Sequence, residues 1–277
     1  MLKLLRANFF RLWRDKVFYL MTALMLLAGA GLPIIHFLDQ DANGGTAWTP
    51  DSSCFAYTYF IPVLLSAFSA LYVGCEYSDG TLRNKLIAGH GRAQVYLANA
   101  VVCVTAGALL SAAFLLPHTA LGLLLLGAFR TDAATLLLYI VLNLMLSAAF
   151  AALFTLISML CQSKAYSCVG CILLAFALLF AGIKIVSSLN EPEFYDAYSY
   201  TENGVTVSQE QEPNPNFLRG NKRKVYEFLH DFTPGGQALQ LANMDAEQPA
   251  LLALYDGIIV LAATGAGMIV FRRRDLK

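Results

Sequence analysis

Six long runs of apolar residues constrain what this chain can fold into. Each run is about 20 residues long, which is the length an α-helix needs to cross a hydrocarbon core of roughly 30 Å. Of the 277 residues, 57% are hydrophobic and 14% are charged, whereas a typical soluble domain carries about 25% charged residues. The sequence therefore predicts an all-α integral membrane protein with six transmembrane helices, at about residues 17–38, 54–73, 95–116, 135–160, 166–186 and 251–270.

The segment before the first run is predicted to be an amphipathic helix. Leu5, Phe9 and Leu12 share one face of such a helix, and Lys3 and Arg11 lie on the other. No small-residue cleavage site follows, which argues against a signal peptide. Residues 1–16 are therefore expected to lie in the plane of the membrane interface, or else to extend the first transmembrane helix into the cytoplasm.

Two stretches fit the six-helix pattern less simply. Residues 119–129 follow Pro117, which is expected to end the third helix, and are apolar but too short to cross a membrane. They either continue that helix beyond the membrane or form a re-entrant piece. Residues 188–250 are polar. Their Asn203-Gly204 pair predicts a β-hairpin with a type I′ turn, followed by a helix over 217–232 that ends at Pro234. This segment is either a lid over a translocation path or a plain extracellular cap.

Charge distribution predicts how the chain is oriented. On one side, the segment 1–16, the loop 74–92, the loop at Lys164 and the tail 271–277 together hold thirteen bases and four acids. The remaining six bases and fifteen acids fall on the other side or at its edge. Because basic residues in short loops stay in the cytoplasm, both termini are predicted to be cytoplasmic. The chain is thus divided into an interfacial helix (1–16), five transmembrane helices (17–187), an extracellular segment (188–250) and a last helix with a basic tail (251–277).

Several kinds of chemistry have no motif in this sequence. The six cysteines lie in or beside apolar runs, so a disulfide framework is not expected. The four histidines are scattered and predict no metal site. No G-x-x-x-x-G-K-[ST] phosphate loop and no G-x-S-x-G nucleophile motif is present, and no pattern predicts a nucleic-acid partner. If a nucleotide drives this protein, a second polypeptide must bind it.

Lys184 and Asp256 are the charged residues placed deepest in the apolar runs. Ionisable groups at such a depth are costly and are usually paired or in contact with water. One hypothesis is that they pair and join the fifth helix to the sixth. The alternative is that each side chain reaches the interface alone.

The polar loop 74–92 carries a short predicted helix between two transmembrane helices. Asp79 or Gly80 is a suitable N-cap, and Gly89 marks the end. Within it, Leu82 and Leu86 are expected on one side and Arg83 and Lys85 on the other. A short amphipathic helix held at a membrane face is suited to docking a partner rather than to catalysis.

The residues of this loop carry a resemblance to a known family. The pattern Glu76-x-x-x-Gly80-Thr81-Leu82-Arg83-x-x-Leu86, followed by Gly89-x-x-Arg92, resembles the first cytoplasmic loop of ABC exporter permeases of the type-2 family. The ending Phe271-x-Arg273-Arg274-Asp275-x-Lys277 is similar to the family as well. The resemblance implies that the loop is a coupling helix seated in a groove of a partner ATPase. It implies these coupling residues: Glu76, Asp79, Gly80, Thr81, Leu82, Arg83, Leu86 and Arg92.

The same resemblance implies the partners and the activity. Two permease protomers, identical or different, would assemble with two ATPase subunits in a bacterial cell membrane, in contact with lipid. ATP and Mg²⁺ would be bound by the ATPase subunits, so this chain would carry no cofactor and would catalyse no reaction. The cargo would be an amphipathic molecule such as an antimicrobial peptide, an antibiotic or a lipid-like compound. Two other functions stay open: a non-transporting sensor or immunity protein that binds a peptide through residues 188–250, and an intramembrane enzyme. Co-purification with an ATPase subunit would separate the first function from the other two.

Overall fold

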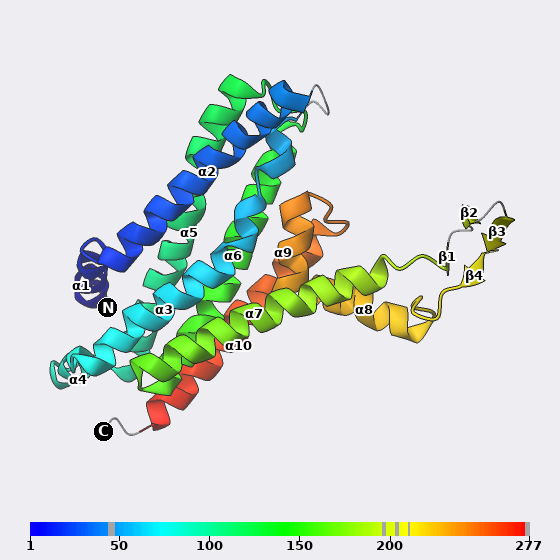
Figure 1. The fold of residues 1–277 in the computed structure, drawn as a ribbon. Helices are drawn as coiled ribbons and strands as arrows, with labels where there is room; N and C mark the ends of the chain where they lie inside the picture. Colours follow the sequence, from blue (N-terminus) through cyan, green and yellow to red (C-terminus); the bar gives the residue numbers. More distant parts are fainter. Residues whose placement is uncertain (44–47, 196–197, 203–204, 210, 275–277) are drawn as a thin grey trace.

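The computed structural model describes residues 1–43, 48–195, 198–202, 205–209 and 211–274. Among these residues, six helices are long and apolar enough to cross a membrane, so the predicted all-α membrane fold is confirmed (Figure 1). The second crossing begins with two 3₁₀ turns, η1 (Pro50–Ser53) and η2 (Ala56–Tyr59). The six helices are α2 (Lys16–Asn43), α3 (Ile61–Ser78), α5 (Arg92–Leu125), α6 (Ala133–Cys161), α7 (Lys164–Leu189) and α10 (Pro249–Arg273).

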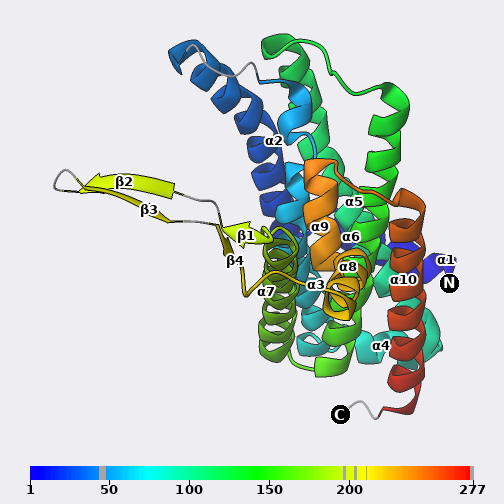
Figure 2. The ribbon, with the colours of Figure 1, turned by 90° about the vertical axis from the view of Figure 1, so that its right-hand side faces the viewer.

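Three of the six helices form the centre of the bundle. At least half of the apolar stretch of α3, α5 and α6 is buried, compared with less than a third in α2, α7 and α10. The outer helices each lie against this centre: α2 along α5, α7 along α3, and α10 along α6 and α5 (Figures 1 and 2). The outer faces of α2, α7 and α10 are apolar and exposed, as expected for surfaces that contact lipid.

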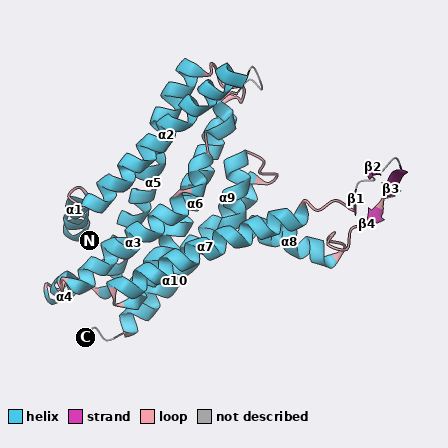
Figure 3. Cartoon of the chain, viewed as in Figure 1, coloured by secondary structure: helices cyan, strands magenta, loops and turns pink. Residues whose placement is uncertain are grey.

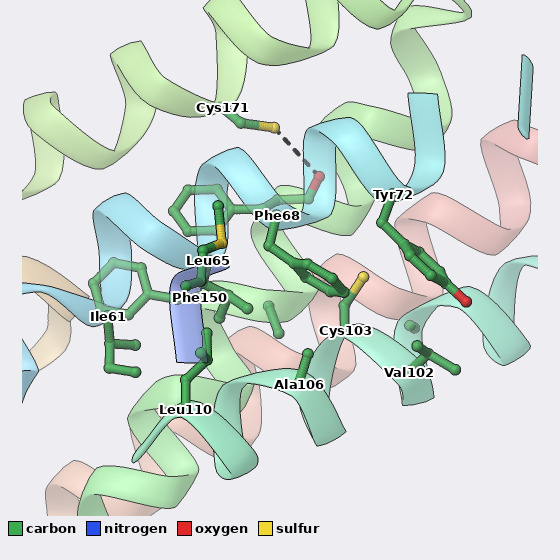
Figure 4. Close-up of a cluster of buried hydrophobic side chains, with 14 of the residues drawn as sticks. Ile61, Leu65, Phe68, Tyr72, Val102, Cys103, Ala106, Leu110, Phe150 and Cys171 are labelled. Atoms are coloured by element: carbon green, nitrogen blue, oxygen red, sulfur yellow. Dashed lines mark hydrogen bonds between the residues drawn. The ribbon is translucent and has the colours of Figure 1, made fainter. Parts of the chain in front are cut away.

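The core is packed by large side chains of α3 against small ones of α5 (Figure 4). Phe68 stacks on Tyr72 with ring centroids 5.2 Å apart, and Cys103 and Ala106 of α5 face them. From α7, the thiol of Cys171 donates to a backbone carbonyl of α6 at 3.5 Å. All six cysteines are free.

One end of the bundle holds α1 (Leu2–Leu12), α4 (Thr81–Ile87), the α6–α7 turn and the end of α10 (Figure 1). We call it the basic end. α1 buries Leu4 and Leu12 and exposes Phe10. It is a separate helix rather than an extension of α2, because the chain turns between them and Asp15 Oδ1 accepts from the first amides of α2, including that of Val17 at 2.8 Å. Residues 1–16 are thus not a continuous extension of the first transmembrane helix, and their position in the membrane interface stays a prediction.

Pro117 does not end its helix, contrary to the prediction. α5 continues through it to Leu125, and α2 runs beside it to Asn43 (Figure 1). A Cβ on Gly29 of α2 would overlap the carbonyl of Phe114, so the two backbones are in close contact just before the proline. This packing compensates for the one hydrogen bond that proline removes. Residues 119–125 are therefore a continuation of the helix and not a re-entrant piece.

Within the residues that the structure describes, the strands all lie in the segment between α7 and α10 (Figure 3). In the described part of the chain, β2 (Tyr198–Glu202) pairs antiparallel with β3 (Val205–Gln209), as predicted. The turn residues Asn203 and Gly204 lie outside the described residues. A second short pair joins β1 (Phe194–Tyr195) to β4 (Glu212–Pro213). The hairpin projects away from the bundle beyond the end of α7 (Figure 2).

Two helices follow the strands, where the sequence predicts one. α8 (Asn221–Phe232) matches the predicted helix, but Pro234 begins α9 (Pro234–Asn243) instead of ending the structure. The hydroxyl of Thr233 caps α9 by accepting from the amide of Gly236 at 3.2 Å. A Cβ on Gly235 would overlap the carbonyl of Leu178, eleven residues before the end of α7. At 1.5 Å per residue this lies about 16 Å below that end, so α8 and α9 form a hairpin that re-enters the bundle.

Candidate functional site

α4 stands between two chain reversals at the basic end. α3 ends at Ser78, and Gly80 then takes a left-handed conformation with φ 67° at the start of α4. Gly89 follows α4 with φ 85°, and α5 begins at Arg92. Glycine adopts positive φ without steric cost, which explains why a helix of only seven residues has sharp ends. The predicted position of the short helix is therefore confirmed.

The two faces of α4 have different surroundings. Leu82 is 2% exposed and packs into the hydrophobic core, and Leu86 is partly buried against it. On the outside, Ile87 is 76% exposed, and Arg83 and Asn84 are exposed beside it. Leu82 thus anchors α4 to the bundle, whereas Arg83, Asn84 and Ile87 form the surface that a partner would meet. We call these three residues the α4 outer face.

A buried carboxylate lies directly behind α4. Glu76, one turn from the end of α3, has no exposed surface. Its Oε1 atom is 2.7 Å from the guanidinium of Arg11 and also pairs with the ammonium of Lys85. Its Oε2 atom accepts from the side-chain amide of Asn99 at 2.9 Å. A buried charge is tolerated only when it is paired and hydrogen-bonded in this way.

Further contacts from Asn8 and Tyr72 hold the two bases in place. Asn8 donates to Asn99 Oδ1 and accepts from Lys85, each at 2.8 Å. The hydroxyl of Tyr72 donates to the backbone carbonyl of Asn8 at 2.8 Å, and the guanidinium of Arg11 lies 3.7 Å from the centre of the Tyr72 ring. Burial lowers the pKa of Lys85, an effect that the Glu76 carboxylate opposes. The network joins α1, α3, α4 and α5, and we call it the Glu76 cluster: Asn8, Arg11, Tyr72, Glu76, Lys85 and Asn99.

The predicted placement of Lys85 on the outer side of α4 is wrong. Its long side chain turns inward and is only 16% exposed, because a fully buried carboxylate lies within its reach. Asn8, Arg11 and Asn99 were not among the predicted site residues. Asn99 could have been suspected, since it is an amide within an apolar run and has to find a hydrogen-bond partner there.

The eight predicted coupling residues occupy different positions around α4. Glu76 and Leu82 are buried, and Gly80, Thr81 and Leu86 are partly buried. Asp79 and Arg83 are exposed. The Thr81 hydroxyl donates to the carbonyl of Glu76 at 3.4 Å, which ties the start of α4 to the end of α3.

Arg92 has a separate position from the other seven. Its guanidinium donates to the carbonyls of Phe271 at 3.5 Å and Arg272 at 3.4 Å, and also to that of Arg274, at the end of α10. Arg274 in turn donates to the carbonyl of Leu160 in α6. A cation beside free carbonyls at a helix C-terminus is favourable. Arg92 therefore links the first residue of α5, just after α4, to the last transmembrane helix.

The structure does not bring Lys184 and Asp256 together. Asp256 is 1% exposed and neither of its carboxylate oxygens has a hydrogen-bond partner, while Lys184 is exposed on α7. α10 packs mainly on α6 and α5, whereas α7 packs mainly on α3 and α9, and no ion pair joins these two described side chains. In the described part of the chain, no group of three or more His, Cys, Asp or Glu residues is placed to hold a metal ion.

The sequence of this chain matches a known protein family over most of the region described above. The profile of a protein family described as ABC-2 family transporter protein matches residues 4–185. The matched region is more than half of the 277-residue chain and runs from α1 through most of α7. It includes α4 and every member of the Glu76 cluster. Among proteins of curated function, none matches this chain.

Proposed function

Because this chain belongs to the ABC-2 family of transporter proteins, we propose that it is the permease of an ATP-driven exporter and that α4 is where the ATPase subunit docks. In this proposal the chain performs no chemistry of its own, and ATP and Mg²⁺ are bound by the ATPase subunit. The basic end faces the cytoplasm, in agreement with its excess of bases. The cargo is an amphipathic molecule that moves along the interface between two permease protomers.

One observation carries the proposal: the helix that projects at the basic end is joined through a buried charge cluster to three other helices. Lys85 of α4, Glu76 of α3, Arg11 of α1 and Asn99 of α5 meet at hydrogen-bond distance. Moving α4 alone would separate these charges in a site with little water, where separation is costly. A displacement of α4 is therefore passed on to α1, α3 and α5.

The link at Arg92 extends this connection to the last helix. Since Arg92 is the first residue of α5 and holds the end of α10, a shift of the α4–α5 connection also pulls on α10. Packed helices change between discrete arrangements rather than deforming continuously. ATP-driven closure of the ATPase subunits would thus switch the bundle between two packings, one of which admits the cargo and the other releases it.

The experiment is to measure co-purification of the ATPase subunit with this chain, and ATP hydrolysis by the two proteins reconstituted in proteoliposomes. Ile87→Asp places a charge on the α4 outer face, where 76% of the side chain is exposed, and is expected to abolish binding of the ATPase subunit. The matched control is Leu124→Asp, on an equally exposed leucine near the far end of α5. Both variants must insert into the membrane and elute from a size-exclusion column as the unmodified protein does. Normal ATPase binding by Ile87→Asp would refute docking at α4, and full function without any ATPase subunit would refute the exporter.

A further inference from the structure

A pocket opens beside the α4 outer face and is shared by three parts of the chain. It has a volume of about 340 Å³. Its walls are the end of α3, the start of α4 and the α6–α7 turn, and its inner wall includes Glu76. Its lining residues are Glu76, Tyr77, Ser78, Gly80, Leu82, Arg83 and Gln162.

The α6–α7 turn is held against α3 by close contacts. A Cβ on Gly74 would come within 2.9 Å of the Cα atom of Lys164, so only glycine allows this approach. The hydroxyl of Tyr77 donates to the carbonyl of Met159 at 2.5 Å. Gln162 adopts a left-handed conformation with φ 47° at the C-cap of α6. These contacts give the pocket a fixed wall opposite α4.

The charges around the pocket leave an excess of positive charge. Glu76 is neutralised by Arg11 and Lys85, which leaves one base in excess within the cluster. Arg83 adds another at the mouth, and in the part of the chain that the structure describes no acid lies within ion-pair distance of it. Asp79 is the one further acid of the α3–α4 connection, and it is exposed. An acidic group is therefore the natural occupant of this pocket.

We propose that the ATPase subunit inserts an acidic side chain into this pocket and pairs it with Arg83. The proposal rests on the proposed function and names the chemistry of the docking contact. A guanidinium binds a carboxylate through two parallel hydrogen bonds, which fixes the orientation of the partner. Ile87, four residues after Arg83 and therefore on the same face of α4, provides an apolar contact beside the ion pair.

The insertion has a consequence that docking on α4 alone would lack. A side chain in this pocket touches α4 on one wall and the α6–α7 turn on the other, so the ATPase subunit would grip two cytoplasmic connections at once. Its movement would then reach α6 and α7 directly and α1, α3 and α5 through the Glu76 cluster.

The test is the dissociation constant of the ATPase subunit for the full chain in nanodiscs of phosphatidylcholine, a neutral lipid. Arg83→Glu is expected to raise Kd about 30-fold or more, as for loss of one partner of a desolvated charge pair, whereas Arg83→Lys raises it less. Lys3→Glu, an equal change of charge at an exposed base of α1 outside the pocket lining, is expected to leave Kd within about twofold, as for a solvent-exposed charge. One acid-to-lysine change in the ATPase subunit should restore binding to Arg83→Glu and not to Ile87→Asp.

The outcomes separate this proposal from the function on which it rests. If Arg83→Glu binds as the unmodified chain does while Ile87→Asp fails, the acidic insertion is wrong and docking at α4 stands. If both variants bind normally, both proposals fail. If Arg83→Glu weakens binding only in nanodiscs that contain an anionic lipid, the pocket holds a lipid headgroup and the proposal is overturned. Should Arg83→Glu fail to fold, Arg83→Gln replaces it, and its Kd should lose the dependence on salt that the unmodified chain shows.

Discussion

Replacing the buried carboxylate of Glu76 by an amide tests whether the cluster at the basic end is held together by charge. Glu76→Gln keeps the shape of the side chain and an acceptor for Asn99, but leaves Arg11 and Lys85 without their counter-charge. With charge centres about 4 Å apart, each pair is worth on the order of 4 kcal/mol at an effective dielectric constant of about 20. Desolvation offsets part of this, and removing one member of a buried pair typically costs about 3–5 kcal/mol. At roughly 2–4 °C per kcal/mol, we expect the unfolding temperature to fall by about 10 °C.

The assay is thermal unfolding of the purified protein in detergent, followed by circular dichroism. Asp79→Asn is the matched control, because it removes an exposed acid only three residues away and should change the unfolding temperature by little. The double variant Glu76→Gln/Lys85→Met should be destabilised by about 1–3 kcal/mol less than the sum of the single variants, since the second change removes one of the two stranded bases. The reasoning would be refuted if Glu76→Gln unfolded at the same temperature as Asp79→Asn. It would also be refuted if the effects of the two changes in the double variant were strictly additive.

Four further variants test other parts of the structure. Arg92→Ala removes the donor to the carbonyls at the end of α10. Exchange of the backbone amides should therefore rise at the end of α10 and not at the far end of α5. Unchanged exchange in α10 would contradict the link. Gly235→Ala should destabilise the protein by several kcal/mol because its Cβ overlaps the carbonyl of Leu178, whereas Gly257→Ala, whose Cβ meets nothing within 4 Å, should stabilise α10 by about 0.5–1 kcal/mol; equal unfolding temperatures would refute the re-entrant contact. Asp256→Leu removes a buried carboxylate with no hydrogen-bond partner. The protein should gain about 1–3 kcal/mol of stability, and its unfolding temperature should rise by a few degrees. A fall in the unfolding temperature would contradict this reasoning.

The transmembrane helices were predictable because their signal is local. A run of about 20 apolar residues has few alternatives to a membrane helix, and all six runs became helices. The ends of α4 were predictable for a similar reason, since Gly80 and Gly89 mark the two reversals by their own conformational freedom. The ends of helices in apolar surroundings were not predictable, because α5 continues through Pro117 without interruption.

The Glu76 cluster could be predicted only in part, because its contacts join residues far apart in the sequence. Asn8 and Asn99 are 91 positions apart, and Lys85 reaches Asn8 across 77. Local periodicity places Lys85 on the polar side of its helix, but a buried carboxylate from the preceding helix outweighs that preference. α9 was missed for a related reason: Pro234-Gly235-Gly236 reads locally as a helix stop, and the helix exists because the glycines fit against α7.

The re-entry of α8 and α9 sets an order for assembly in the membrane. α9 is ten residues long, too short to be retained by the bilayer as a crossing segment during synthesis. With the basic end in the cytoplasm, as proposed, the polypeptide from the end of α7 to the start of α10 passes through the membrane first, and α9 then packs into a site that exists only once α6 and α7 are in place. We therefore expect maturation to end with a post-insertion step, before which Gly235 and Gly236 are accessible to added protease and after which they are buried.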